Sequence, residues 1–276
     1  MKNKWIYGKT VAISGASGGL GFNLAKTLIE KYSCTVYAIA RNQKKLDDCL
    51  QKLGNNANKF IPMIFDVSNK QGWHDFSCML NYNNIQLDVL INNAGFMLPF
   101  SKFEKYSDSE IEEIVSTNFV AHVNAVKILL PQLKKSTSPA IINISSSAGQ
   151  CAVVGESMYC ATKFAMRGFT ETLTQEYKKQ IYVAGIYPGF IKTDILNRMS
   201  VKDKENKLIN HLMTPVEKAT KKIIRKIVKK RKRIVLGVDG KSMTFFSRLF
   251  PKLAPSIVTS VLKVSKLELF SNVFED

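Results

Sequence analysis

The sequence offers few of the residues that cross-link a fold or hold a metal ion. It has five cysteines, an odd number, and no two of them form a C-x-x-C pair. Its three histidines lie far apart, with no ligand spacing among them. These absences argue against a disulfide framework and against a zinc site, and they suit a reducing compartment.

Long apolar runs, repeats and linkers are missing as well. The chain starts with Met1-Lys2-Asn3-Lys4 and soon enters an apolar stretch, Thr10 to Ile13, without the longer apolar segment and cleavage site of a signal peptide. No run approaches the roughly 20 apolar residues that span a bilayer. No internal repeat, low-complexity tract or proline-rich linker divides the chain. We therefore expect a single cytoplasmic domain.

What is present is an alternation of short apolar runs with longer segments of helical period. Of the 276 residues, 45% are hydrophobic and 22% are charged, as is typical of a globular protein. Strands are expected at Val11–Ile13, Val36–Ile39, Ile61–Phe65, Val89–Ile91, Ile141–Ile144, Val183–Ile186 and Ile234–Leu236. Helices are expected near residues 19–31, 43–53, 70–80, 108–134, 157–179 and 216–230. The alternation predicts an α/β single-domain Rossmann fold, a doubly wound parallel seven-stranded sheet with helices on both faces.

A glycine-rich turn follows the first expected strand, with the sequence Ser14-Gly15-Ala16-Ser17-Gly18-Gly19-Leu20-Gly21. Its glycines let the backbone turn tightly and approach a pyrophosphate, and the helix that follows supplies free N–H groups and a favourable dipole. An ordinary glycine turn would give the same match. The position at the first turn of a doubly wound sheet favours dinucleotide binding.

The end of the second expected strand bears on which dinucleotide is bound; it reads Ile39-Ala40-Arg41-Asn42. An acidic residue there hydrogen-bonds the ribose of NAD, whereas a nearby arginine accommodates the 2′-phosphate of NADP. No acid stands at Ala40, and Arg41 offers a planar donor fork to phosphate. The alternative is that Arg41 is a solvated residue at a helix start. We favour NADP over NAD.

Tyr159 and Lys163 stand four residues apart in an expected helix, and Ser146 lies thirteen residues before the tyrosine. Residues i and i+4 share one helix face, so the ammonium can lie near the phenol. A phenol titrates near pH ~10, and a neighbouring positive charge lowers that pKa toward the working range. A Ser146 hydroxyl, at the end of a buried strand, can bond the same substrate oxygen. The three residues predict proton transfer to and from an alcohol or ketone.

Further motifs accompany these residues: Asp66-Val67 after the third expected strand, Asn92-Asn93-Ala94-Gly95 after the fourth, Asn118 in a long helix, and Pro188-Gly189 before Thr193. In this order they resemble the classical short-chain dehydrogenase/reductase family. The similarity extends from about Thr10 to Thr193, roughly two-thirds of the chain.

The resemblance implies a role for each catalytic residue. Tyr159 would be the general acid in ketone reduction and the general base in alcohol oxidation. Lys163 would lower the Tyr159 pKa and bind the nicotinamide ribose, and Ser146 would orient the substrate carbonyl. Asn118 would hold a water that connects Lys163 to solvent; the alternative is a helix-surface amide.

The resemblance also implies which residues hold the cofactor. Asp66 would contact the adenine through its side chain and Val67 through its backbone, and Asn92 would lie along the cofactor edge unless it only forms a turn. Thr193 would steady the nicotinamide carboxamide or the pyrophosphate. The full expected set is Ser14, Gly15, Ser17, Gly19, Leu20, Gly21, Arg41, Asp66, Val67, Asn92, Ala94, Gly95, Tyr159, Lys163, Pro188, Gly189, Ile191 and Thr193.

The C-terminal part is basic and apolar. The net charge of +18 is concentrated between Lys202 and Arg233, where 13 Lys/Arg against 3 Asp/Glu give a net of +10. Residues 194–211 are expected to form a mobile lid, and residues 218–230 an amphipathic helix whose basic face is solvated. Residues 1–240 would be the dinucleotide-binding and catalytic part, and residues 241–276 an apolar helical tail of the same domain. The tail would cover the substrate mouth, enter a subunit interface or, with the basic segment, lie on an anionic membrane.

We therefore expect an NADP-preferring short-chain oxidoreductase that moves a hydride between the cofactor and a lipophilic secondary alcohol or ketone. A homodimer or homotetramer is implied, and no specific nucleic-acid module is visible. One alternative is a ketoacyl-thioester reductase whose acidic carrier docks on the basic patch. Another is a catalytically silent nucleotide-sensing or scaffold protein with the same fold. Such a protein has no need for Tyr159, Lys163, Ser146 and Asn118 together.

Overall fold

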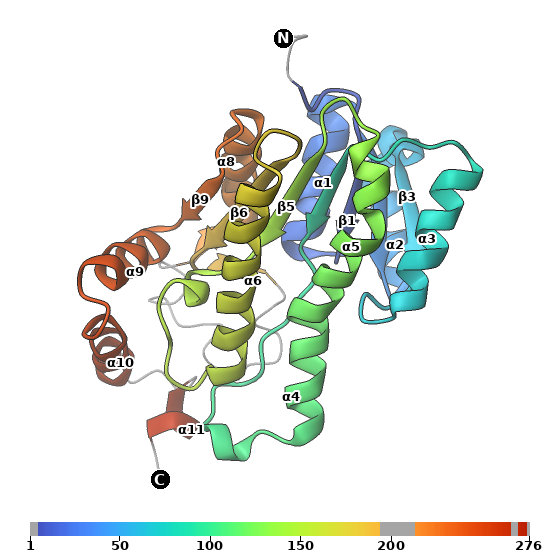
Figure 1. The fold of residues 1–276 in the computed structure, drawn as a ribbon. Coiled ribbons are helices and arrows are strands. Elements are labelled where there is room, and N and C mark those ends of the chain that lie inside the picture. Colours follow the sequence, from blue (N-terminus) through green and yellow to red (C-terminus); the bar gives the residue numbers. More distant parts are fainter. Residues whose placement is uncertain (1–4, 194–212, 266–269, 275–276) are drawn as a thin grey trace.

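The computed structural model describes residues 5–193, 213–265 and 270–274, and its centre is a parallel sheet (Figure 1). Seven strands follow the order β3-β2-β1-β4-β5-β6-β9. They are β1 (Thr10–Ser14), β2 (Thr35–Ala40), β3 (Phe60–Ile64), β4 (Val89–Asn92), β5 (Ala140–Ile144), β6 (Tyr182–Pro188) and β9 (Arg233–Leu236). The predicted doubly wound α/β fold is confirmed.

Helices cover both faces of the sheet (Figure 1). One layer holds α1 (Gly19–Tyr32), α2 (Gln43–Leu53) and α8 (Val216–Val228). The other holds α3 (Lys70–Tyr82), α5 (Ala121–Lys134) and α6 (Ser157–Glu176). Each layer has its own apolar core, because successive strand residues point to opposite faces: Val11 and Ile13 pack in one core and Ala12 in the other. This explains why the strands read as continuous apolar runs.

Strand β1 lies between β2 and β4, with Val11 paired to Val36 on one side and Val89 on the other. The chain order reverses at this point, so a crevice opens at the carboxyl ends of the strands, which is where doubly wound sheets bind ligands. The glycine turn after β1, Arg41 after β2 and Asn93 after β4 all emerge there.

The helix predicted over 108–134 is built from three segments: α4 (Asp108–Val115), a π-helical turn η3 (Ser116–Val120) and α5. Within the part of the chain that the structure describes, this is the one helix long and apolar enough to cross a membrane. It packs against α3 and α6. The π turn buries Asn118, and such turns occur frequently at functional sites.

The C-terminal tail returns to the sheet edge beside the crevice. It forms α9 (Val238–Leu249), α10 (Ala254–Ser265) and α11 (Ser271–Phe274). Phe270 packs edge-on against Phe100 at a centroid distance of 4.7 Å, in a third apolar cluster that also contains Tyr159. The expected lid over 194–211 lies outside the described residues. Short elements complete the chain: η1 (Gly54–Lys59), η2 (Phe103–Lys105), η4 (Ser147–Gly149), β7 (Ile191–Lys192) and β8 (Thr214–Pro215).

Candidate active site

A cavity of about 1240 Å³ occupies the carboxyl ends of the strands. It extends from the glycine turn to α9 and α10, and both ends of the predicted site open into it. Of the predicted residues it is lined by Gly15, Ser17, Gly19, Leu20, Arg41, Ala94, Gly95, Ser146, Tyr159, Lys163, Pro188, Gly189, Ile191 and Thr193. One continuous space therefore joins the expected cofactor and proton-transfer groups.

The glycine turn is fastened to the end of β4. Gly15 has φ +68°, and a Cβ there would lie 2.9 Å from the Ala94 Cα. The Ser14 hydroxyl accepts hydrogen bonds from the N–H groups of Asn93 (2.9 Å) and Ala94 (3.0 Å). The Asn93 amide donates in turn to the carbonyls of Ser14 and Gly15, at 3.0 and 3.2 Å. Asn93 was not predicted as a site residue, although it stands within the matching motif.

At the end of the cavity where the adenosine is expected, basic side chains outnumber the one acid, Asp48. Arg41 lines it together with Lys26, Lys45 and Lys52. The Arg41 guanidinium lies 3.4 Å from an Asp66 carboxylate oxygen, and both side chains are well exposed. Lys45 and its neighbours were not predicted, because a lysine on a helix is usually only a solvated residue.

The Asp66 carboxylate stabilises the loop after β3. Its carboxylate accepts from the Ser68 N–H and hydroxyl, at 2.9 and 2.7 Å. Burial acts to raise the Asp66 pKa, but the Ser68 hydrogen bonds and the Arg41 charge outweigh it, so that pKa lies below its ordinary value. The carboxylate therefore stays charged and partly offsets Arg41.

Several predicted residues do not line the described part of the cavity but lie directly behind it and support it. Gly21 lies in α1 under the turn, and the Val67 carbonyl accepts the Trp73 indole N–H at 2.8 Å. Asn92 is fully buried and donates to the Asn143 amide oxygen at 2.8 Å, which links β4 to β5. Asn92 does not form the turn that the sequence left as an alternative, because it is the last residue of strand β4.

The residues predicted to transfer protons meet at the middle of the cavity. Tyr159 and Lys163 are buried on α6, and the Lys163 ammonium lies 5.4 Å from the centre of the Tyr159 ring. The Ser146 hydroxyl, just beyond β5, hydrogen-bonds the Tyr159 side chain. Ser145 points the other way and donates to the Lys163 carbonyl at 2.9 Å, which fixes the β5 end against α6.

Burial dominates the protonation of these groups. It raises the pKa of Tyr159, against the Ser146 hydrogen bond, which lowers it. Burial also lowers the pKa of Lys163 to about 8, so this ammonium begins to lose its charge just above neutral pH. The lowering of the Tyr159 pKa that the sequence predicts is not seen in this structure, because removal of the phenol from water is the largest effect.

Asn118 lies beneath Lys163 rather than on a helix surface. Its amide accepts from the Phe96 N–H at 3.0 Å and donates to the Phe96 carbonyl at 2.9 Å. A Cβ on Gly95 would approach the Asn118 oxygen to 3.0 Å and the Lys163 nitrogen to 3.4 Å, so these three residues are tightly packed together. Asn118 thus holds the segment after β4 against Lys163, and its predicted water-binding role stays a prediction.

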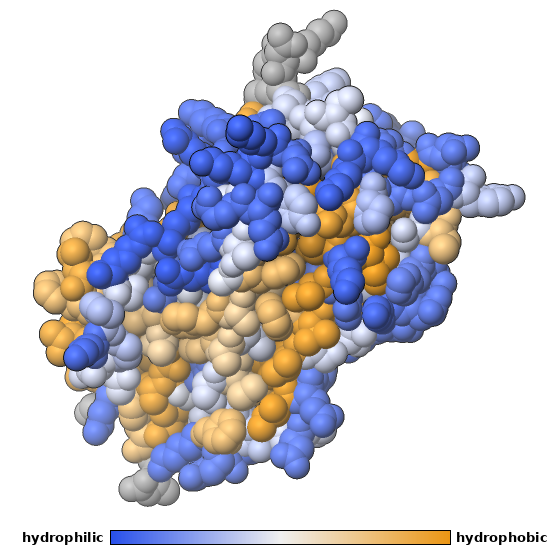
Figure 2. Space-filling view, viewed as in Figure 1, coloured by the Kyte–Doolittle hydropathy of each residue, from blue (hydrophilic) through white to orange (hydrophobic). Residues whose placement is uncertain are grey.

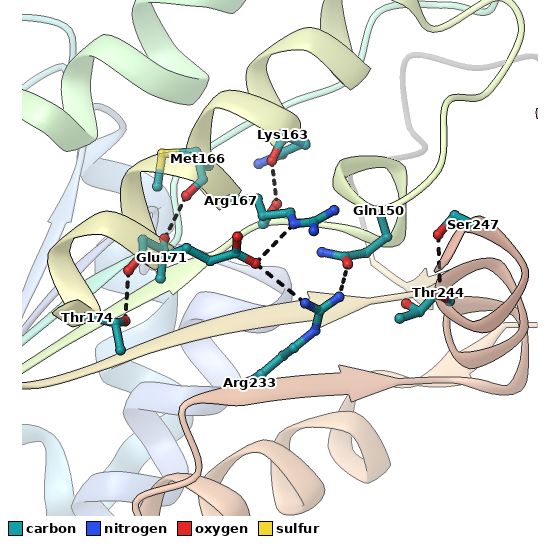
Figure 3. A network of polar contacts seen from close by, with 11 residues as sticks. Gln150, Lys163, Met166, Arg167, Glu171, Thr174, Arg233, Thr244 and Ser247 are labelled. Carbon is teal, nitrogen blue, oxygen red and sulfur yellow. Dashed lines mark hydrogen bonds and ion pairs between the residues drawn. The ribbon is translucent and has the colours of Figure 1, made fainter. Parts of the chain in front are cut away.

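A polar network braces the loop that carries Ser146 (Figure 3). The Arg233 guanidinium on β9 bonds the Gln150 amide oxygen, four residues after Ser146. It also lies 3.4 Å from the Glu171 carboxylate on α6, which in turn pairs with Arg167 at 3.0 Å. The network joins β9 at the sheet edge, the Ser146 loop and α6.

The far end of the cavity is mostly apolar. Its wall comes from the segment after β4 and from the tail, with Phe96, Met97, Phe100, Val258, Leu262 and Phe270. The tail therefore lines this end of the cavity. One acidic residue, Glu156, also lines this end.

Known proteins resemble this chain in both sequence and fold. A family model described as short chain dehydrogenase matches residues 9–204. A "Tropinone reductase homolog" of Datura stramonium is 30% identical over 221 residues, 78% of this chain and 82% of that protein. A "3-oxoacyl-[acyl-carrier-protein] reductase FabG" of Rickettsia typhi is 31% identical over 203 residues, 72% of this chain and 79% of that protein.

Two solved structures show the same fold with different nucleotides. A short chain dehydrogenase from Burkholderia cenocepacia in complex with NADP superposes with a TM-score of 0.77 at 20% identity, covering 92% of this chain and 98% of the other. A relative from Burkholderia phymatum in complex with NAD gives a TM-score of 0.79 at 18% identity, covering 90% and 95%. With the family motifs gathered around one cavity, the chain belongs to the short-chain dehydrogenase family, whose members are oxidoreductases.

Proposed function

We propose that the protein reduces ketones of apolar molecules with NADPH, and oxidises the corresponding secondary alcohols in the reverse direction. The observation that carries this is the shared cavity: it runs from the glycine turn, past Tyr159, Ser146 and Lys163, to an apolar wall. A nicotinamide cofactor would supply the hydride. Tyr159 would give a proton to the carbonyl oxygen, Ser146 would orient that oxygen, and Lys163 would hold positive charge beneath the pair.

The experiment that tests this function is a panel of ketones and secondary alcohols followed by nicotinamide absorbance. Each compound is offered with NADPH and NADH, or with their oxidised forms. Turnover of apolar ketones supports the proposal. A failure of the whole panel, with the nucleotide still bound, would favour the alternative of a nucleotide-sensing or scaffold protein.

The preference for NADPH rests on the basic adenosine end. Arg41→Ala is expected to raise the KM for NADPH about tenfold or more and the KM for NADH less than about threefold, since charge-assisted bonds to the 2′-phosphate are the stronger ones. Initial rates with each nucleotide measure this. Lys44→Ala, at an exposed lysine in α2 that does not line the cavity, is the control. Equal effects of Arg41→Ala on the two KM values would contradict the preference for NADPH. A related structure with the same fold binds NAD, so the fold alone does not decide which nucleotide is preferred.

A ketoacyl thioester is the second candidate substrate. Arg225, Lys226, Lys229, Arg231 and Arg233 line a basic hollow on the surface, where an acidic carrier protein would dock. The Rickettsia typhi relative is named for this chemistry. Turnover of acetoacetyl thioesters in preference to simple ketones would favour this function.

We propose that the tail also contacts an anionic membrane. Figure 2 shows apolar surface over α9 and α10, where Phe245, Leu249, Leu253 and Val261 are each more than half exposed. With the basic side chains of α8, these residues are expected to bring the protein down with anionic vesicles at low salt and to release it at high salt. Co-sedimentation measures this, and equal recovery with neutral vesicles or none would argue against it.

A second apolar area in Figure 2 lies over α5 and α6. Val120 is 41% exposed and Phe164 is 40% exposed there. We propose this face for the homodimer or homotetramer that the family resemblance implies.

A further inference from the structure

Glu156 is a buried acid that the proton-transfer chemistry does not use. It stands at the start of α6, one helical turn before Tyr159, and only 2% of it is exposed. Among the described residues neither carboxyl oxygen has a hydrogen-bond partner. Buried carboxyl groups are normally hydrogen-bonded or paired, so this one requires an explanation.

The neighbouring polar groups are already occupied by one another. The Glu156 side chain does not cap α6, although it stands at the N-cap position. The Tyr106 hydroxyl donates to the Gly155 carbonyl at 2.6 Å. The Cys160 sulfur accepts from the Val153 N–H at 3.3 Å and donates to the Val153 carbonyl at 3.8 Å. Burial raises the pKa of Glu156 well above its ordinary value, and no cation in the described part of the chain opposes that rise. The described residues around this side chain therefore give it no donor and no countercharge.

The backbone just before Glu156 packs closely against the C-terminal tail and the segment after β4. Gly155 has φ +81°, and a Cβ there would lie 2.5 Å from Val273 and 3.2 Å from Phe100. Glu156 thus lies at the end of the cavity where the C-terminal tail closes it, away from the glycine turn. Its neighbours along that wall, Phe100 and Phe270, are apolar. Because the described residues supply no partner for Glu156, a molecule that enters this end of the cavity can supply one.

We propose that Glu156 is a specificity residue that receives a hydrogen-bond donor of the substrate, a hydroxyl or a protonated amine placed a few bonds from the reacting carbonyl. Residues three apart on a helix lie about 5–6 Å apart at their Cβ atoms, so one ligand can reach both Tyr159 and Glu156. The apolar wall would take the hydrocarbon part of the same molecule. This proposal rests on the proposed ketone reduction and narrows it from any lipophilic ketone to a ketone that bears a donor.

Matched ketones test the proposal: 4-methyl-, 4-hydroxy- and 4-aminocyclohexanone with NADPH. Wild type is expected to show a kcat/KM for the hydroxy or amino ketone at least about tenfold above that for the methyl ketone. A site built around a polar group rejects an analogue that leaves the group unpaired. Glu156→Leu is expected to lose about 10- to 100-fold on the donor ketones and to keep or improve the methyl ketone. Glu176→Gln, at the exposed other end of α6, is the control.

The two donors are separated by Glu156→Gln, which keeps the shape and the hydrogen-bonding capacity but cannot become an anion. If the natural donor is a hydroxyl, this variant retains the hydroxy ketone within about threefold; if it is an ammonium, the amino ketone loses about tenfold. This variant also decides the matter if Glu156→Leu does not fold. Equal losses on all three ketones would show a structural role and overturn the proposal, as would a wild type that does not discriminate among them.

Binding separates a failure of this proposal from a failure of the proposed function. The three corresponding cyclohexanols are titrated by calorimetry into wild type and Glu156→Leu saturated with NADPH, which cannot accept a hydride from the alcohol. Tighter binding of the hydroxy and amino compounds by wild type, lost in the variant, supports the Glu156 contact even if no ketone is turned over. Turnover without any such difference in binding or kcat/KM keeps the proposed function and removes the Glu156 contact.

Discussion

Tyr159→Phe is expected to lower kcat about 100- to 10,000-fold, because the substitution removes the proton that the carbonyl oxygen must receive as the hydride arrives. The ring keeps its place in the apolar cluster with Phe100 and Phe270, so the fold and the NADPH site stay intact. Besides the acidic proton, the substitution removes the hydrogen bond between the phenol and Ser146. The loss should therefore appear in kcat, with the Kd for NADPH changed less than about threefold.

Steady-state rates and NADPH fluorescence titration measure the two quantities for Tyr159→Phe. Tyr82→Phe, at a side chain that is 88% exposed, is the matched control and should leave both unchanged. A Tyr159→Phe enzyme that keeps more than a tenth of the wild-type kcat would show that another group delivers the proton. A loss of NADPH binding would instead point to a structural effect.

The fold could be predicted from the sequence because a parallel strand is buried on both faces and therefore reads as a continuous apolar run. Every expected strand lies within two residues of its position in the structure, and α2 has the expected bounds. The proximity of Tyr159 and Lys163 could also be predicted from the sequence, since residues i and i+4 share one face of any helix. What the sequence cannot show is an environment. The pKa of Lys163 depends on burial by α6, η3 and the segment after β4, which are brought together only by the fold.

Residues missed by the sequence reasoning are those whose importance comes from their neighbours. Asn93 resembles a turn residue until its amide is seen to close the glycine turn. Glu156 resembles an ordinary helix-start acid until its two oxygens are found buried with no partner among the described residues. Arg41 and Asp66 were both predicted, but the ion pair between them was not, because it joins loops that are 25 residues apart. Each signal depends on how two distant parts of the chain meet.

Gly21→Ala is expected to destabilise the protein and weaken NADPH binding, although alanine is the better helix former. Gly21 is fully buried in the first turn of α1. A Cβ there would lie 2.2 Å from the Gly15 carbonyl oxygen and 2.6 Å from the Asn93 amide nitrogen, far inside van der Waals contact. Helix propensity favours the alanine by about 1 kcal/mol. Overpacking of a well-fitted site costs about 1–3 kcal/mol and here acts on backbone that cannot rotate away, so we expect the clash to win.

The same substitution at Gly168 provides the control for helix propensity. Gly168 lies exposed on α6, and a Cβ there would meet nothing within 4 Å among the described residues. Gly168→Ala should therefore stabilise the fold by about 0.5–1 kcal/mol, while Gly21→Ala should lower the urea midpoint and raise the Kd for NADPH about tenfold. Both effects of Gly21→Ala share one cause, since the carbonyl that must move belongs to the turn that approaches the pyrophosphate. If Gly21→Ala were as stable as Gly168→Ala and bound NADPH normally, the close packing of α1 against this turn would not be what shapes the nucleotide site.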